Sequence, residues 1–73
     1  MSDNKKEIAI DTEDIKLDQF LKWANVVSSG GEAKHLIAEG CVKVNGEIET
    51  KRGRKITKGD IIELKGNKSF KVI

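Results

Sequence analysis

Several kinds of residue are scarce or absent in this chain of 73 residues, which has no proline, one cysteine and one histidine. A lone cysteine, Cys41, excludes a disulfide within the chain and a multi-cysteine metal site. A lone histidine, His35, excludes a cluster of imidazole ligands. We therefore expect no metal and no cofactor. Cys41 is interpreted as a small hydrophobic residue in or near the core, and His35 as a solvent-facing side chain on a helix.

Long apolar runs are also missing, since no run exceeds three residues. A membrane helix needs about 20 consecutive apolar residues, and a signal peptide also carries a continuous apolar stretch. Neither pattern occurs in the sequence. A cytoplasmic protein that does not engage a membrane is the default expectation.

The composition limits the size of the core. Hydrophobic residues make up 37% of the chain and charged residues 36%, against an average charged share of about 25%. Such a chain builds one thin core with little room for an enclosed substrate cavity, which argues against an enzyme. We expect a flexible polar N-terminus at residues 1–6, one domain at residues 7–73, and a monomer by default.

The net charge of +2 hides an asymmetry along the chain. Through Ala33, four lysines oppose seven acids, and from Lys34 onward ten basic residues oppose five acids. A basic second half suggests a polyanionic partner, most often nucleic acid. The alternative is a lysine-rich surface that only keeps the protein in solution.

The stretch from Ser28 to Gly46 organises the chain. Ser29 and Glu32 have the spacing of a capping box, in which a hydroxyl and a carboxylate each accept a free backbone N–H. A helix is predicted over residues 30–39, ended by Gly40. Strands at 41–44 and 47–50 flank Asn45-Gly46, a strong signal for a β-hairpin turn.

The remaining segments predict a small mixed domain. A strand is expected at residues 7–11, an acidic connection at 12–14 and a helix at 17–25. Two more strands are expected at Ile61–Leu64 and Phe70–Val72, and turns are expected at 57–60 and 66–68.

Two features of the helices allow alternative interpretations. Trp23 lies at the border of the apolar face of the first helix, where core packing is favoured over contact with a partner. Gly30 and Gly31 either allow the first helix to pack closely, which is slightly favoured, or expose backbone N–H groups to a phosphate.

A basic run gives the best chemical signal. Lys51, Arg52, Arg54 and Lys55 place four cations within five residues, around Gly53. The planar guanidinium of arginine suits a phosphate because it donates two parallel hydrogen bonds. Lys34 on the second helix and Lys43 on the hairpin would extend this surface, and the alternative is a solvated loop.

The order of these residues resembles a known family. Lys16-Leu17-Asp18-x-Phe20-Leu21 is followed by Gly31-Glu32-Ala33-Lys34-x-Leu36-Ile37-x-x-Gly40-x-Val42-x-Val44-Asn45-Gly46, and then by Gly59-Asp60 before an apolar strand. This pattern, over roughly residues 15–64, is similar to the S4 RNA-binding domain. The run from Arg52 to Ile56 and the short N-terminal strand resemble the small stand-alone bacterial S4 proteins of the YaaA type.

The resemblance implies an α+β fold of the S4-like or αL type, in which two packed helices lie against a small, twisted, mostly antiparallel sheet. It also implies that the helices and the hairpin contact structured RNA, such as ribosomal RNA or a tRNA-like RNA. The family usually has arginine at position 16, and a lysine there keeps the charge without the bidentate geometry. The family also often has an arginine near Gly30-Gly31. The second-helix segment that meets RNA contains Gly30, Glu32, Lys34 and His35, and the hairpin part contains Lys43, Asn45 and Gly46.

The sequence therefore predicts a non-catalytic RNA-binding protein that acts on a ribosomal subunit or an assembly particle. The predicted RNA-binding residues are Lys16, Lys34, His35, Lys43, Asn45, Arg52, Arg54 and Lys55, with additional contacts possible at Trp23, Gly30 and Lys51. The alternatives are a protein–protein adaptor on a ribosomal or replication partner, and an accessory to an enzyme.

Overall fold

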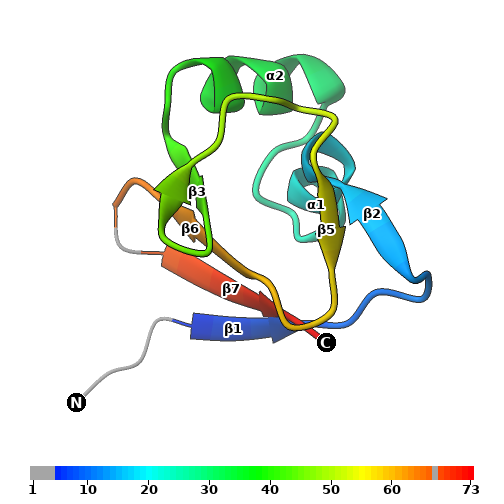
Figure 1. Cartoon of the computed structure of the whole chain (residues 1–73). Coiled ribbons are helices and arrows are strands. Elements are labelled where there is room, and N and C mark those ends of the chain that lie inside the picture. Colours follow the sequence, from blue (N-terminus) through cyan, green and yellow to red (C-terminus); the bar gives the residue numbers. More distant parts are fainter. Residues whose placement is uncertain (1–4, 67) are drawn as a thin grey trace.

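The computed structural model describes residues 5–66 and 68–73, which form two helices, a five-stranded sheet and a two-stranded ribbon (Figure 1). In chain order the elements are β1 Lys5–Ile8, β2 Asp14–Lys16, α1 Leu17–Trp23, α2 Gly30–Ala38, β3 Val42–Val44, β4 Glu47–Ile48, β5 Lys55–Thr57, β6 Ile61–Leu64 and β7 Lys68–Val72. The predicted α+β class is confirmed.

The five-stranded sheet has the order β1-β7-β6-β3-β4. Its pairs are antiparallel except for β1 and β7, which run parallel. The mostly antiparallel character is therefore confirmed. The second sheet is the ribbon formed by β2 and β5, which lies apart from the larger sheet and leads directly into α1.

Both helices and both sheets contribute to one core. Phe20 of α1 meets Phe70 of β7 edge to face, with ring centroids 6.3 Å apart and an interplanar angle of 76°. Fully burying an aliphatic or aromatic side chain of this size is worth about 1.5–3 kcal/mol. The buried hydrophobic residues are Ile10, Leu17, Phe20, Leu21, Val27, Ala33, Ile37, Val42, Val44, Ile56, Ile62, Phe70 and Val72.

Helix α1 is shorter than the predicted range of 17–25. Its C-cap is Ala24, and Asn25 has a left-handed φ of 60° that stops the helix. The favoured interpretation of Trp23 as a core residue was wrong, because this side chain is 54% exposed. Its indole Nε1 donates a hydrogen bond of 2.7 Å to the carbonyl of Ala9, and so ties the segment after β1 to the end of α1.

Helix α2 begins with the predicted cap, in modified form. Ser29 Oγ accepts the Glu32 N–H at 3.3 Å, whereas the Glu32 carboxylate accepts the N–H of Ser28, at 2.8 Å, instead of that of Ser29. The Ser28 hydroxyl also donates to this carboxylate, and these bonds lower the pKa of Glu32. The helix ends at Ala38, one residue before the predicted end, with Glu39 as its C-cap.

The packing interpretation of the two glycines at the start of α2 was also wrong. A Cβ at Gly30 would meet nothing within 4 Å, and one at Gly31 would meet only Ser29 Oγ at 3.9 Å. Neither glycine is therefore needed for a close approach of α1. Gly40 has the expected left-handed φ of 75°, and the hairpin turn at Asn45-Gly46 is confirmed by φ values of 53° and 88°.

The strand bounds differ from the prediction mainly near the N-terminus. The strand predicted at 7–11 is β1, Lys5–Ile8, so Lys5 and Lys6 belong to a strand, and the rest of the predicted flexible segment lies outside the described residues. Asp14 belongs to β2 instead of an acidic connection.

The hairpin strands are shorter than predicted, since β3 begins at Val42 and β4 ends at Ile48. Lys68 already belongs to β7, and Asn67 of the turn predicted at 66–68 lies outside the described residues.

Candidate nucleic-acid interface

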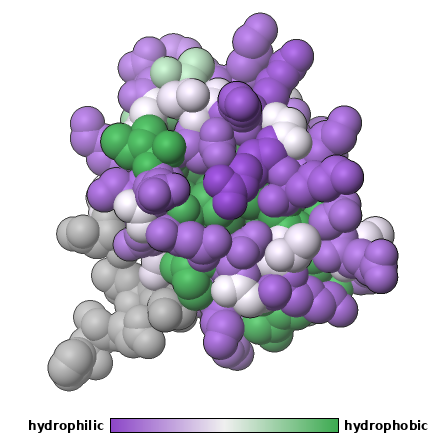
Figure 2. Space-filling view, viewed as in Figure 1, coloured by the Kyte–Doolittle hydropathy of each residue, from purple (hydrophilic) through white to green (hydrophobic). Residues whose placement is uncertain are grey.

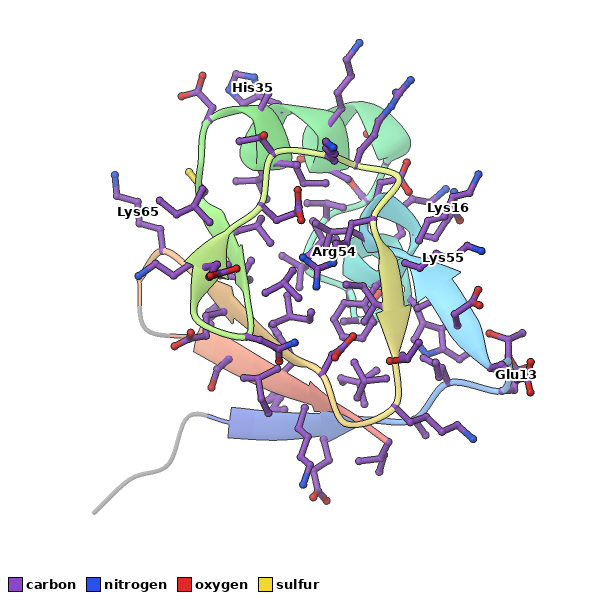
Figure 3. The ribbon with its side chains drawn as sticks, in the orientation of Figure 1. Glu13, Lys16, His35, Arg54, Lys55 and Lys65 are labelled. Carbon is purple, nitrogen blue, oxygen red and sulfur yellow. The ribbon has the colours of Figure 1, made fainter. Side chains whose placement is uncertain are left out.

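Two predicted site residues lie directly opposite each other. Lys16 ends β2, Lys55 begins β5, and the antiparallel register of the ribbon makes them Cα partners. Both residues are exposed. Figure 3 shows their side chains projecting together from the ribbon, on the side of the molecule opposite Lys65. The ribbon thus unites two cations that are 39 positions apart in the numbering, Lys16 and Lys55.

The ribbon forms because one half-buried residue, Ile15, pairs with the fully buried Ile56. Since side chains alternate across a strand, the neighbours of these isoleucines face outward. Like charges directly opposite on one face of a sheet destabilise it. Of the carboxylates in the described residues, none lies within 4.0 Å of either Lys16 or Lys55. An anion between the two ammonium groups would relieve their repulsion.

The basic loop after β4 is attached to the start of α1. The carbonyl of Arg54 accepts the Leu17 N–H at 2.8 Å, and that of Arg52 accepts the Asp18 N–H at 3.1 Å. Helix α1 has no side-chain cap, so these loop carbonyls satisfy N–H groups that would otherwise be unpaired. The loop is therefore fixed next to Lys16, the residue that precedes α1.

The cations of this loop differ in their surroundings. Lys51 and Arg52 are exposed, whereas Arg54 is partly buried and its Nη1 lies 2.8 Å from Glu49 Oε1. In Figure 3 the Arg54 side chain turns toward the middle of the molecule, unlike those of Lys16 and Lys55. Arg54 is thus engaged within the protein.

Glu49 holds both ends of the same loop. Its Oε1 accepts the Arg54 guanidinium and its Oε2 accepts the Lys51 N–H at 3.1 Å. Only 16% of the Glu49 side chain is exposed. The hydrogen bond from Arg54, together with that from Lys51, lowers the pKa of Glu49 below its ordinary value of 4.5. No sequence pattern signals this role of Glu49, because a spacing of five residues in a loop matches no regular contact.

Two further predicted residues lie on α2. Lys34 and His35 are both exposed, and Figure 3 shows His35 on the outer side of the helix, as expected. His35 borders a shallow hollow together with Val26, Leu36 and Gly31. Gly30, in the first turn of the helix, is exposed as well.

The hairpin residues have other neighbours. Lys43 lies on the face of the sheet that points away from the core and is in register with Glu63 on β6. Asn45 uses both amide atoms within the chain, since Nδ2 donates to Asp60 Oδ1 at 3.1 Å and Oδ1 accepts the Ile61 N–H at 2.9 Å. The structure therefore does not place Lys43 on the ribbon, and it gives Asn45 a bonding role inside the fold.

The exposed cations of the ribbon and the loop form what we call the ribbon–loop surface, made of Lys16, Lys51, Arg52 and Lys55. The face of the molecule in Figure 2 is mainly hydrophilic, with small and separate apolar areas. Such a surface is suited to binding a polyanion through several phosphate contacts.

The described residues also lack two kinds of feature. Residues 5–66 and 68–73 contain no group of three or more histidine, cysteine, aspartate or glutamate side chains placed to hold a metal ion. No helix within these ranges is long and apolar enough to cross a membrane.

Comparison with known proteins gives a consistent result. A family model described as "S4 domain" matches residues 8–73. The "Probable ribosome maturation protein RlbA" of Bacillus subtilis (strain 168) is 52% identical over 66 residues, which cover 90% of this chain and 93% of that protein. The "Putative RNA-binding protein YbcJ" of Escherichia coli (strain K12) is 40% identical over 53 residues, covering 73% and 76% of the two chains.

Two solved structures have similar folds. The solution structure of YbcJ from E. coli, described as revealing an αL motif involved in RNA binding, superimposes with a TM-score of 0.67 at 32% identity and covers 100% of this chain and 91% of that one. The 30S ribosomal protein S4e from Thermoplasma acidophilum has a TM-score of 0.64 at 24% identity, covering 85% of this chain and 32% of that one. The second likeness concerns the fold alone.

Proposed function

Because the chain belongs to the S4 domain family, we propose that it is a non-catalytic RNA-binding protein whose ribbon–loop surface docks on the phosphates of structured RNA. Relatives named for RNA binding and for ribosome maturation support this proposal. The predicted fold and family, on which the proposal depends, agree with the structure.

The direct pairing of Lys16 with Lys55 is the observation that carries the proposal. Two exposed like charges opposite each other cost stability unless an anion lies between them. Arg52 adds a guanidinium from the loop whose carbonyls cap α1, and Lys51 adds a fourth cation. We propose that these four side chains bind neighbouring phosphates, and that Lys34 and His35 extend the contact along α2.

The chemistry of this surface favours recognition of shape over base sequence. Lysine ammonium groups bind phosphate oxygens as point charges and carry no base-specific pattern. A fixed spacing of cations selects an RNA whose phosphates have a matching arrangement, as in helical or folded RNA. Neutralising several phosphates makes the affinity steeply dependent on salt.

We propose ribosomal RNA or an assembling ribosomal particle as the target, in the cytoplasm, with the protein acting as a monomer. The relative named for ribosome maturation, which is matched over 93% of its length, supports this choice of target.

The test is RNA crosslinking in cells followed by sequencing of the bound fragments, combined with binding measurements in vitro. We expect enrichment of discrete ribosomal RNA segments. In vitro, changing Lys16 and Lys55 together to Gln should weaken binding and make the plot of log affinity against log salt shallower by about 0.7–0.9 for each lost phosphate contact.

The charge-matched control changes Lys65 and Lys71 to Gln. Lys65 projects on the opposite side of the molecule from Lys16 and Lys55 (Figure 3). Lys71 lies on β7 of the larger sheet. The control should keep the salt slope of the native protein. Equal losses in both double variants would overturn the assignment of the surface. Binding that resists high salt and nuclease treatment would favour a protein partner instead.

A further inference from the structure

The basic loop lies next to Lys16 because several bonds fix its backbone. At its far end, the carbonyls of Arg52 and Arg54 cap α1. At its near end, the Glu49 N–H donates a hydrogen bond of 3.0 Å to the carbonyl of Val42, which ties the loop to β3. Between these two ends, one side chain holds the loop, because the Glu49 carboxylate accepts hydrogen bonds from both the Lys51 N–H and the Arg54 guanidinium.

The geometry of this carboxylate separates the cations into two groups. Arg54 is drawn inward to Glu49, and the Arg54 N–H also donates 3.2 Å to the carbonyl of Lys51, closing the turn. The side chains of Lys51, where this turn begins, and of Arg52, at its tip, are left exposed. Within the loop, the ion pair of Arg54 with Glu49 therefore leaves Lys51 and Arg52 facing solvent.

We infer that Glu49 is a positioning residue for RNA binding, which holds the loop in the form that presents Lys51 and Arg52 alongside the Lys16–Lys55 pair. This inference rests on the proposed function. Glu49 is an acid close to a surface for a polyanion, so its charge and its positioning role act on RNA binding in opposite directions. If only its charge mattered, removing Glu49 would strengthen RNA binding. If it positions the loop, removing it weakens RNA binding.

The test compares Glu49→Gln with Glu47→Gln in an RNA titration at several salt concentrations. A glutamine amide has one acceptor oxygen where the carboxylate has two, so it cannot serve both donors in the same way. Glu47 is an exposed neighbour on β4, and its replacement removes the same charge without touching the loop bonds. We expect E49Q to weaken binding about three- to tenfold, the cost of ordering one or two freed side chains on binding, and E47Q to keep or raise the affinity.

A second readout and a second variant separate positioning from general loss of fold. Amide exchange of the Lys51 N–H should quicken in E49Q while that of the core residues stays slow. Glu49→Asp keeps the net charge and shortens the side chain by one methylene, so a weaker affinity in E49D than in Glu47→Asp reports on positioning alone, should E49Q fail to fold.

The possible outcomes are distinct. Native protein that binds RNA, with E49Q and E49D as tight as their Glu47 counterparts, would overturn the role of Glu49 and leave the proposed function standing. Native protein that binds no structured RNA would overturn both.

Discussion

Asn45 and Asp60, fifteen residues apart, join the turn between β3 and β4 to the turn before β6. Asn45 Nδ2 donates a hydrogen bond of 3.1 Å to Asp60 Oδ1. Asp60 also accepts the Thr57 N–H at 2.9 Å through its other oxygen. Burial raises the pKa of Asp60, but the hydrogen bonds from Thr57 and Asn45 outweigh it, and the pKa lies below its ordinary value of 3.8.

The Asp60 contact predicts a dependence of stability on pH. A carboxyl whose pKa is lower in the folded than in the unfolded protein stabilises fully above its unfolded pKa, and this contribution is lost as the pH falls through the folded pKa. Asp60→Asn should therefore lower the free energy of unfolding by about 1 kcal/mol at pH 7. The difference from the native protein should shrink below pH 3.8. Denaturant unfolding at pH 7 and at acidic pH measures both values, and a difference that stays constant would contradict the assignment.

The Lys16–Lys55 pair predicts opposite effects on stability and binding. Lys55→Gln removes a repulsion between like charges across the ribbon, so the free energy of unfolding should rise by a few tenths of a kcal/mol and at most about 1 kcal/mol. The same change should weaken RNA binding, most strongly at low salt. Thermal unfolding and an RNA titration of one preparation give both numbers. Lys58→Gln, in the exposed turn that follows β5, serves as the comparison.

Gly31 predicts a gain in stability from a larger residue. A Cβ there would meet only Ser29 Oγ at an ordinary distance of 3.9 Å, and Gly31 has no left-handed φ. Gly31→Ala should raise the free energy of unfolding by up to about 1 kcal/mol, the helix propensity difference between the two residues. Gly40→Ala provides the contrast and should lower it, because Gly40 has a φ of 75°. An RNA affinity that falls in Gly31→Ala would indicate that the bare backbone at the start of α2 contacts the ligand.

The hydrogen bond from Trp23 to Ala9 is expected to affect stability and not RNA binding, because it lies outside the ribbon–loop surface. Trp23→Phe keeps an aromatic ring and removes the N–H that bonds to Ala9, so the free energy of unfolding should fall by about 1 kcal/mol. Because this indole N–H is satisfied within the chain, we expect the RNA affinity to remain unchanged. A large loss of affinity with unchanged stability would instead support the predicted contact of Trp23 with RNA.

The elements with regular periodicity could be predicted from the sequence. The second helix, the Asn45-Gly46 turn and the strand at Ile61–Leu64 each have local signals, and each lies within about one residue of its predicted place. The family resemblance added the arrangement of the helices against a mostly antiparallel sheet, which no single segment specifies.

The β2–β5 ribbon could not be predicted, because its signal is not local. Each strand has three residues with one apolar side chain at its centre, Ile15 or Ile56, too few for an alternation to be detected. The pairing forms because these two isoleucines meet across 40 intervening residues and pack against the core. Asp14 therefore had no sign of strand structure around it.

The cations of the candidate site could be listed from the sequence, but their surroundings in the fold could not. The run from Lys51 to Lys55 marked the cations, and nothing in it distinguished Arg54 from Arg52. That distinction arises from Glu49, whose carboxylate engages one guanidinium and leaves the other exposed. The exposed fraction of a charged side chain depends on such partners, which a one-dimensional pattern does not specify.

The parallel pairing of β1 with β7 has a consequence for how the chain folds during synthesis. Lys5 is in register with Ser69 and Ile8 with Val72, so the N-terminal strand has to wait for the last strand before it can pair. Contacts between such distant segments slow folding, because the entropy of closing a long loop is lost before the stabilising contacts form. The pairing of β1 therefore follows the synthesis of β7, after the segments that form α1, α2 and the hairpin have already been made.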